Sequence, residues 1–148
     1  MPESTHKKPV AHRAPAHHAS HKYVEAVGRR KTAIARVRIM KGTGGMTVNG
    51  MDAKKYFSLP RLAVVAKAPA ERVGIAKEFD VTAKVVGGGV HAQAEAIRLG
   101  FARAIVKQSP EWKKQLRAMG FLTRDSRMVE RKKYGLKKAR RSPQWAKR

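Results

Sequence analysis

The densest cluster of chemically active side chains lies in the last eighteen residues, 131–148, of which nine are Lys or Arg and none is acidic. Both side chains are positively charged hydrogen-bond donors, so a run of them is suited to binding phosphates. The run cannot collapse on itself, because like charges repel and only Tyr134, Leu136 and Trp145 offer apolar surface. The interleaved aromatic residues favour a segment that follows a polyanion, with stacked rings and cations on phosphates. A solubilising tail without a partner is the alternative.

The stretch Gly28-Arg29-Arg30-Lys31 is a second candidate for phosphate binding. A glycine followed by three cations between two predicted strands places positive charge where the backbone turns outward. Two more cations, Arg36 and Arg38, lie on the polar face of the strand that follows. A solvated basic turn is the alternative for this motif taken alone.

The third candidate is Gly87-Gly88-Gly89, which stands between a predicted strand and a predicted helix. Such a loop exposes backbone N–H groups at the positive end of the helix dipole. Three glycines can also serve only a tight turn, but Arg98 on the helix favours RNA phosphate as the occupant. A small-molecule kinase is a rival. It lacks support, because no G-x-x-x-x-G-K-[ST] spacing exists and the ten acidic residues show no convergent spacing for Mg²⁺.

The overall charge predicts a polyanionic partner. A formal charge of +24 and a pI near 11.3 exceed what self-repulsion allows an ordinary soluble domain. Nucleic acid is the first expectation, and a nonspecific DNA-packaging protein remains a rival. A membrane partner would need an amphipathic basic helix with a bulky apolar face, which the tail lacks. Without cysteine, an apolar run of about 20 residues or a signal-peptide core, the chain is expected to be soluble and intracellular.

Residues 1–22 are expected to form a disordered basic extension, because they are rich in His, Pro and Ala and have almost nothing to bury. Their five histidines match no zinc spacing. His91 and Glu95 are one helical turn apart but have no third ligand nearby. No metal or other cofactor is predicted.

Period-two alternation predicts the strands that position these candidates. Residues 23–27 read as a short strand that ends at Gly28. Residues 32–40 alternate an apolar with a cationic face. The stretch Gly42-Thr43-Gly44-Gly45 then predicts a hairpin turn, and residues 46–48 a returning strand. Residues 79–85 give a further strand by the same test.

Caps and helical periodicity predict the helices. Asp52 is expected to cap a short helix through Phe57. Pro60 begins a helix over 61–67, with Leu62, Val65 and Ala66 toward the sheet, and Pro69 is expected to end it. A long helix follows the glycine loop and ends near Gln108; its core stripe is Val90, Ala94, Ile97, Phe101, Ala104 and Ile105. The Ser109 hydroxyl and Pro110 begin a last helix, with Trp112, Leu116 and Met119 on its apolar edge, which ends at Gly120.

Three stretches of the chain resemble one family closely, the universal ninth protein of the small ribosomal subunit. They are Glu130-Arg-Lys-Lys-Tyr-Gly-Leu-Lys-Lys-Ala-Arg-Arg with Pro143-Gln-Trp and Lys147-Arg148 behind it, Gly28-Arg-Arg-Lys-Thr-Ala, and Gln93-Ala-Glu-Ala-Ile-Arg-Leu-Gly. The resemblance runs from about Tyr23 to Arg148. It implies an α+β two-layer sandwich over residues 23–120, with a mixed four-stranded sheet, helices on one face and a left-handed β-α-β crossover. Residues 121–148 would form an extended basic tail.

The same resemblance implies a function without catalysis: a structural protein of the small ribosomal subunit. The domain would bind ribosomal RNA in the head of the subunit, beside neighbouring head proteins. Lys147 and Arg148 would contact the anticodon arm of transfer RNA in the peptidyl site. A ribosome of the bacterial cytoplasm is favoured over an organellar one, because the extension contains Glu3 and lacks an amphipathic Arg pattern. Neither a membrane nor a small-molecule substrate is expected. The residues expected to bind ribosomal RNA are Arg29, Arg30, Lys31, Arg36, Arg38, Gly87, Gly88, Gly89, Arg98, Arg124, Arg131, Lys132, Lys133, Tyr134, Lys137, Lys138, Arg140 and Arg141.

Overall fold

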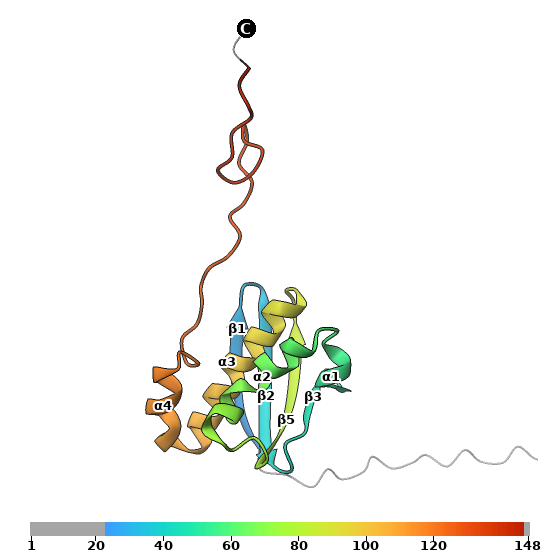
Figure 1. Ribbon diagram of the computed structural model, residues 1–148, viewed down its shortest axis with the longest axis vertical. Coiled ribbons are helices and arrows are strands. Elements are labelled where there is room, and N and C mark those ends of the chain that lie inside the picture. Colours follow the sequence, from blue (N-terminus) through green and yellow to red (C-terminus); the bar gives the residue numbers. More distant parts are fainter. Residues whose placement is uncertain (1–22, 147–148) are drawn as a thin grey trace, which may run out of the picture.

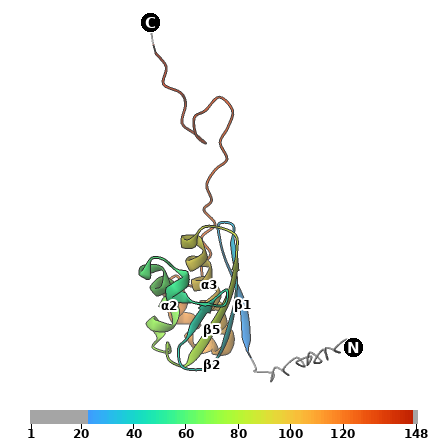
Figure 2. The same ribbon diagram turned by 90° about the vertical axis from the view of Figure 1, so that its right-hand side faces the viewer.

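A mixed five-stranded sheet, with its two long helices packed on one face, forms the body of the protein in a computed structural model that describes residues 23–146 (Figures 1 and 2). The expected extension, residues 1–22, and the expected contacts of Lys147 and Arg148 lie outside the described residues. The buried residues are apolar and lie between the sheet and the helices. The tail leaves this body and projects beyond one end of the sheet.

The five strands are β1 (Val24–Arg30), β2 (Ala33–Lys41), β3 (Met46–Val48), β4 (Met51–Asp52) and β5 (Phe79–Val86), in the spatial order β1-β2-β5-β3-β4. The prediction of a four-stranded sheet is therefore wrong, because the sheet has five strands. The extra strand, β4, forms because Asn49 (φ 50°) and Gly50 (φ 83°) turn the chain back on β3. Asn-Gly is the sequence typical of such a two-residue hairpin, since both positions need positive φ.

The expected hairpin between β2 and β3 is also wrong, because β5 lies between them, antiparallel to β2 and parallel to β3. Residues 42–45, Gly-Thr-Gly-Gly, form a loop instead. The backbone N–H groups of Thr43, Gly44 and Gly45 all donate to Oδ1 of Asp80, at 3.0, 3.0 and 2.8 Å. The pKa of Asp80 is lowered, mainly by the bond from Gly45.

The parallel strands β3 and β5 are joined through β4 and two helices, which makes a β-α-β unit. The left hand of this crossover stays a prediction. In α1 (Ala53–Tyr56) the Asp52 side chain accepts from Lys54 N at 2.9 Å, which confirms the predicted cap.

Helix α2 (Pro60–Val73) begins at Pro60 as predicted, but it runs through Pro69 and ends at Gly74 with φ 83°. The expected end at Pro69 is wrong. Pro69 removes one backbone donor, but it is buried, as are Leu62, Ala66 and Ala70 of the same helix. Packing of that face against the body offsets the lost hydrogen bond. Val65 is only half-buried.

Strand β1 does not end at Gly28 but continues to Arg30, so that only Lys31 and Thr32 turn the chain into β2. Gly28 lies inside this strand and faces helix α3 (Val90–Gln108) at very short range. A Cβ built at Gly28 would lie 1.9 Å from the backbone O of Ala96. Without a side chain here, strand and helix meet through their backbones.

Helix α3 ends at Gln108 as predicted, and its stripe is buried except for Val90, which is 47% exposed in the first turn. The expected cap at Ser109 is wrong. The Ser109 hydroxyl makes no capping bond; its backbone N–H donates to Ile105 O and completes α3. A 3-10 turn, η1 (Pro110–Trp112), precedes α4 (Lys113–Ala118). Leu116 anchors α4 in the core, and Gly120 follows at φ 74°.

Candidate nucleic-acid interface

The glycine loop and the β1–β2 turn lie together at one end of the sheet, which we call the hairpin end: residues 31–32 and 87–89. Gly87 (φ 74°) and Gly88 (φ 66°) adopt conformations that favour glycine. A Cβ at Gly87 would lie 2.7 Å from Thr32 O, and one at Gly88 2.9 Å from the Cβ of Ala33. The glycines thus let the loop pack against the turn. They also leave the start of α3 exposed, since Gly89 provides no side-chain cap.

The open face of the sheet presents cations and aliphatic side chains. Arg36 lies beside Lys84 across strands β2 and β5, and Arg29 lies beside Ile34 across β1 and β2. Arg29, Arg36 and Lys84 are exposed. The exposed aliphatic residues of this face are Val27, Ile34 and Val86. The face is therefore positive and partly apolar.

One carboxylate, that of Glu25, neutralises part of the positive charge on this face. Its Oε2 accepts from Arg38 Nε at 2.7 Å, and its Oε1 lies 3.2 Å from Arg36 Nε. The hydrogen bond to Glu25 raises the pKa of Arg38, whose guanidinium also lies 4.6 Å from the centre of the Tyr23 ring. Arg38 is half-buried by these contacts, whereas the side chain of Arg36 is 57% exposed. Of the two, Arg36 is the better placed to meet an external anion.

Arg30 differs from its neighbours, because its side chain is only 13% exposed. Its Nε bonds to Glu95 on α3, and its second amino group lies 2.9 Å from Oδ2 of Asp125 in the tail. It also donates to the backbone O of Arg127 at 2.8 Å. The residue predicted to bind phosphate thus has its guanidinium engaged by protein groups.

The cations of α3 face the protein as well. Arg98 is half-buried, with its guanidinium 5.9 Å from the centre of the Phe121 ring. Arg103 donates to Val27 O at 2.8 Å on the outer edge of β1, and so covers the open edge of the sheet. Arg124, just after the core, is exposed.

The tail passes beyond the hairpin end of the sheet in both views (Figures 1 and 2). Residues 121–148 are predicted to form an extended tail, but the described part of the tail is not extended throughout. Residues 130–141 form a closed loop, in which Arg140 bonds to both carboxylate oxygens of Glu130 and Lys137 N donates to Arg141 O at 2.7 Å. Gly135, at φ 73°, turns the chain. The exposed cations of this loop are Arg131, Lys132, Lys133, Lys137, Lys138, Arg140 and Arg141.

Two aromatic side chains of the tail are almost fully exposed, Tyr134 at 99% and Trp145 at 92%. In water, exposed rings of this size are unfavourable, whereas a nucleobase could cover them by stacking. The tail therefore combines donors and rings of the kinds that recognise RNA.

Sequence reasoning missed the acidic residues of the chain. They divide the cations into two groups, those that are bound to a carboxylate and those that are exposed and available to an external anion. Glu25, Glu95, Asp125 and Glu130 each bind one or more arginines, and most of these pairs join residues that are not neighbours in sequence. The sequence could have indicated these pairs, because acidic residues are rare in so basic a chain. Each acidic residue is therefore expected to lie beside a Lys or Arg side chain.

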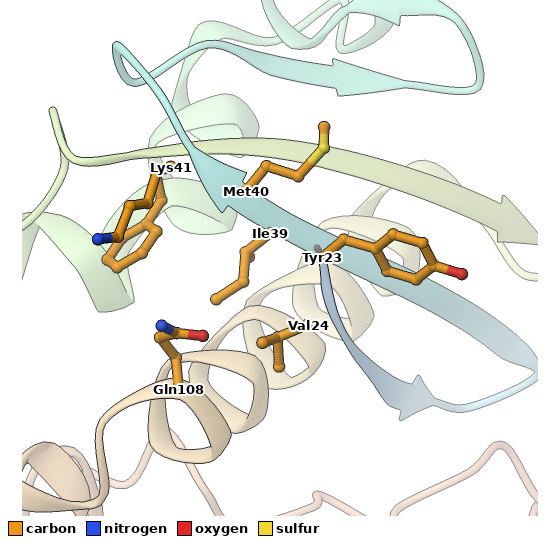
Figure 3. A pocket seen from close by; sticks show the side chains of 7 residues that line it. Tyr23, Val24, Ile39, Met40, Lys41 and Gln108 are labelled. Carbon is orange, nitrogen blue, oxygen red and sulfur yellow. The ribbon is translucent and has the colours of Figure 1, made fainter. Parts of the chain in front are cut away.

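A cleft of about 500 Å³ lies at the other end of the sheet, where β1 begins and α3 ends (Figure 3). Its lining residues are Tyr23, Val24, Ile39, Met40, Lys41, Phe79 and Gln108. They include no carboxylate and no histidine. Within residues 23–146, no group of three His, Asp or Glu side chains could hold a metal ion, and no helix is long and apolar enough to span a bilayer.

Comparison with known proteins agrees with this geometry. The family model described as ribosomal protein S9/S16 matches residues 28–148. The small ribosomal subunit protein uS9 of Cytophaga hutchinsonii is 51% identical over 125 residues, which cover 84% of this chain and 98% of the relative. That of Nostoc punctiforme is 51% identical over 122 residues (82% and 88%), and the uS9c protein of Gracilaria tenuistipitata is 48% identical (82% and 89%). The chain therefore belongs to the ribosomal protein S9/S16 family.

Proposed function

We propose that this protein is a structural constituent of the small ribosomal subunit and binds ribosomal RNA with the hairpin end of its sheet and with its tail. The observation that carries the proposal is that most arginines near the carboxylates of the body are bound to them, whereas most cations of the tail loop are exposed. Glu25, Glu95 and Asp125 engage arginines near the body, whereas the loop 130–141 has seven exposed cations and the single carboxylate of Glu130. The relatives' names place them in the small subunit.

The proposed RNA contacts follow from the exposed groups. Phosphates bind Lys31, the N–H groups at residues 87–89 and the cations of the loop 130–141, and each contact releases counterions from the RNA. Tyr134 stacks on an unpaired base, because a ring that is 99% exposed has no protein cover. Arg29, Arg36 and Arg124 add cations on the body and at the start of the tail. Arg38, Arg98 and Arg30, which lie against protein groups, contribute mainly by holding those elements in place.

We further propose where in the small subunit the body and the tail bind. The body binds RNA in the head of the subunit, next to other head proteins, and the tail reaches the peptidyl site. There Lys147 and Arg148 contact transfer-RNA phosphates, which positions the polyanion without making or breaking bonds. The tail supports this assignment, because it projects away from the body, beyond the hairpin end of the sheet (Figure 1). The ribosome in question is cytoplasmic.

Sedimentation tests the assignment to the small subunit. In a sucrose gradient of lysate, the tagged chain should migrate with the small subunit at moderate salt. Its recovery at the top of the gradient, free of particles, would contradict the proposal.

Competition separates ribosomal RNA from nonspecific binding. Labelled small-subunit RNA bound to the protein is challenged with unlabelled RNA or with duplex DNA of equal nucleotide concentration. Unlabelled RNA should displace the label at much lower concentration. Equal displacement by DNA would favour a nonspecific packaging protein instead.

A further inference from the structure

We propose that Arg30 is a positioning residue that fixes the direction in which the tail leaves the body. The inference concerns the protein alone; only its benefit to RNA binding rests on the proposed function. Arg30 stands at the last position of β1, inside the stretch whose cations the sequence assigned to phosphates. Its structural partners indicate a different use.

The guanidinium of Arg30 joins three parts of the chain. It extends from β1, bonds through Nε to Glu95 on α3, and reaches Asp125 in the tail, where its amino group lies 2.9 Å from Oδ2. It also donates to two backbone carbonyls of the tail, Arg127 O at 2.8 Å and Asp125 O at 3.4 Å. We call this set of contacts the Arg30 bracket. In sequence, Arg30 is 95 positions from Asp125 and 97 positions from Arg127.

The tail backbone is held on its own side of the bracket as well. Oδ1 of Asp125 accepts from the backbone N–H of Arg127 at 2.9 Å, and the carboxylate also binds the Arg127 guanidinium. These bonds lower the pKa of Asp125, the side-chain bond to Arg127 most. The Asp125 side chain thus holds the backbone of residues 125–127, and Arg30 attaches this segment to the body through both backbone and side-chain atoms of the tail.

The shape of the guanidinium explains why the bracket sets a direction. Its donors lie in one rigid plane, so three acceptors bound at once define the orientation of the tail relative to β1 and α3. A Lys ammonium is a single point charge and cannot bind the carboxylate of Glu95, that of Asp125 and the carbonyl of Arg127 in the same way. Charge alone would therefore not replace Arg30.

Direction matters because the tail is long. Before the bracket, Phe121 and Leu122 pack against the core; after it, residues 126–133 are exposed. The tail extends well beyond the hairpin end of the sheet (Figure 1), so a modest rotation at its origin displaces the far end by many ångströms. Restricting that rotation raises the effective concentration of the tail at its binding site.

Distance measurements between spin labels test the bracket. The chain contains no cysteine, so Lys84→Cys on β5 and Val129→Cys just past the bracket give one defined pair. The parent pair should show a single narrow distance distribution. Arg30→Ala and Arg30→Lys should both lose this narrow peak, and Asp125→Ala, which leaves the contact between Arg30 and Glu95 in place, should lose it too.

The matched control is Arg29→Ala, which removes the same charge from the neighbouring, exposed position. Its distribution should stay narrow. The inference is overturned if Arg30→Ala keeps the parent distribution while remaining folded, or if Arg29→Ala broadens it equally. Should Arg30→Ala unfold, Arg30→Lys decides, because it keeps the charge and the place on β1 but lacks the planar set of donors. The experiment needs no RNA, so its outcome is independent of whether the chain migrates with the small subunit.

Discussion

Gly28 of β1 and Ala96 of α3 bring a strand and a helix into direct backbone contact. A Cβ at Gly28 would lie 1.9 Å from Ala96 O and 2.4 Å from Gly100 N. Both neighbours are backbone atoms of a buried helix, so they cannot move aside as a flexible side chain would. The position of β1 on α3, and with it the position of Arg30, depends on this contact.

Gly28→Ala is expected to destabilise the fold by about 1–3 kcal/mol or more, because overpacking forces β1 away from α3. Urea unfolding followed by circular dichroism measures the loss. Gly89→Ala is the control, since a Cβ there meets nothing within 4 Å and the φ of −92° is ordinary. An equal loss in both variants would show that close approach at Gly28 is not the cause.

Leu116→Ala should cost about 2–5 kcal/mol of unfolding free energy, because it leaves a cavity where a fully buried side chain anchors α4. Met119→Ala, at a position that is 39% exposed, should cost much less. The same urea titration compares them. Similar losses would mean that α4 is not held by Leu116.

Asp80→Asn should lower the melting temperature at neutral pH, because the carboxylate binds three N–H groups of the glycine loop. These bonds lower the pKa of Asp80 below its ordinary value of 3.8. The stabilisation is therefore present above pH 4 or so, and it is lost as the pH falls through the lowered pKa. The difference in melting temperature between Asp80→Asn and the parent should shrink below about pH 4. A constant difference across this range would contradict the role of the charge.

Lys137→Ala with Lys138→Ala should weaken binding to small-subunit RNA and flatten its salt dependence. The slope of log K against log salt should fall by about 0.7–0.9 for each phosphate that the protein no longer neutralises. Filter binding at several salt concentrations gives the slope. The control, Lys41→Ala with Lys77→Ala, removes equal charge from exposed positions at the opposite end of the sheet. Equal slopes in the two variants would indicate that only total charge matters.

The elements with strong local signals could be predicted from the sequence. Strands β2 and β5 showed clear period-two alternation, and α3 had a regular apolar stripe that ends at Gln108. The α1 cap at Asp52 was equally local. These features depend on residues close together in the chain, so pattern and propensity determine them.

The remaining features depend on interactions between distant residues. Nothing near residues 42–45 indicates that β5 lies between β2 and β3, or that Asp80 binds the loop amides. Pro69 could remain inside α2 only because tertiary packing offsets its missing N–H. The sequence around Arg30 predicts RNA binding, but it gives no sign of the contacts with the carboxylates of Glu95 and Asp125, which lie more than sixty residues away.

The central claim is that the body places a cationic tail at a site that the body itself cannot reach. Small subunits assembled with a chain that ends at Ala146, without Lys147 and Arg148, test it most directly. The affinity of transfer RNA for the peptidyl site should fall, while the sedimentation and the protein content of the subunit remain normal. Unchanged affinity in intact subunits, or failure of the shortened chain to assemble, would contradict the account.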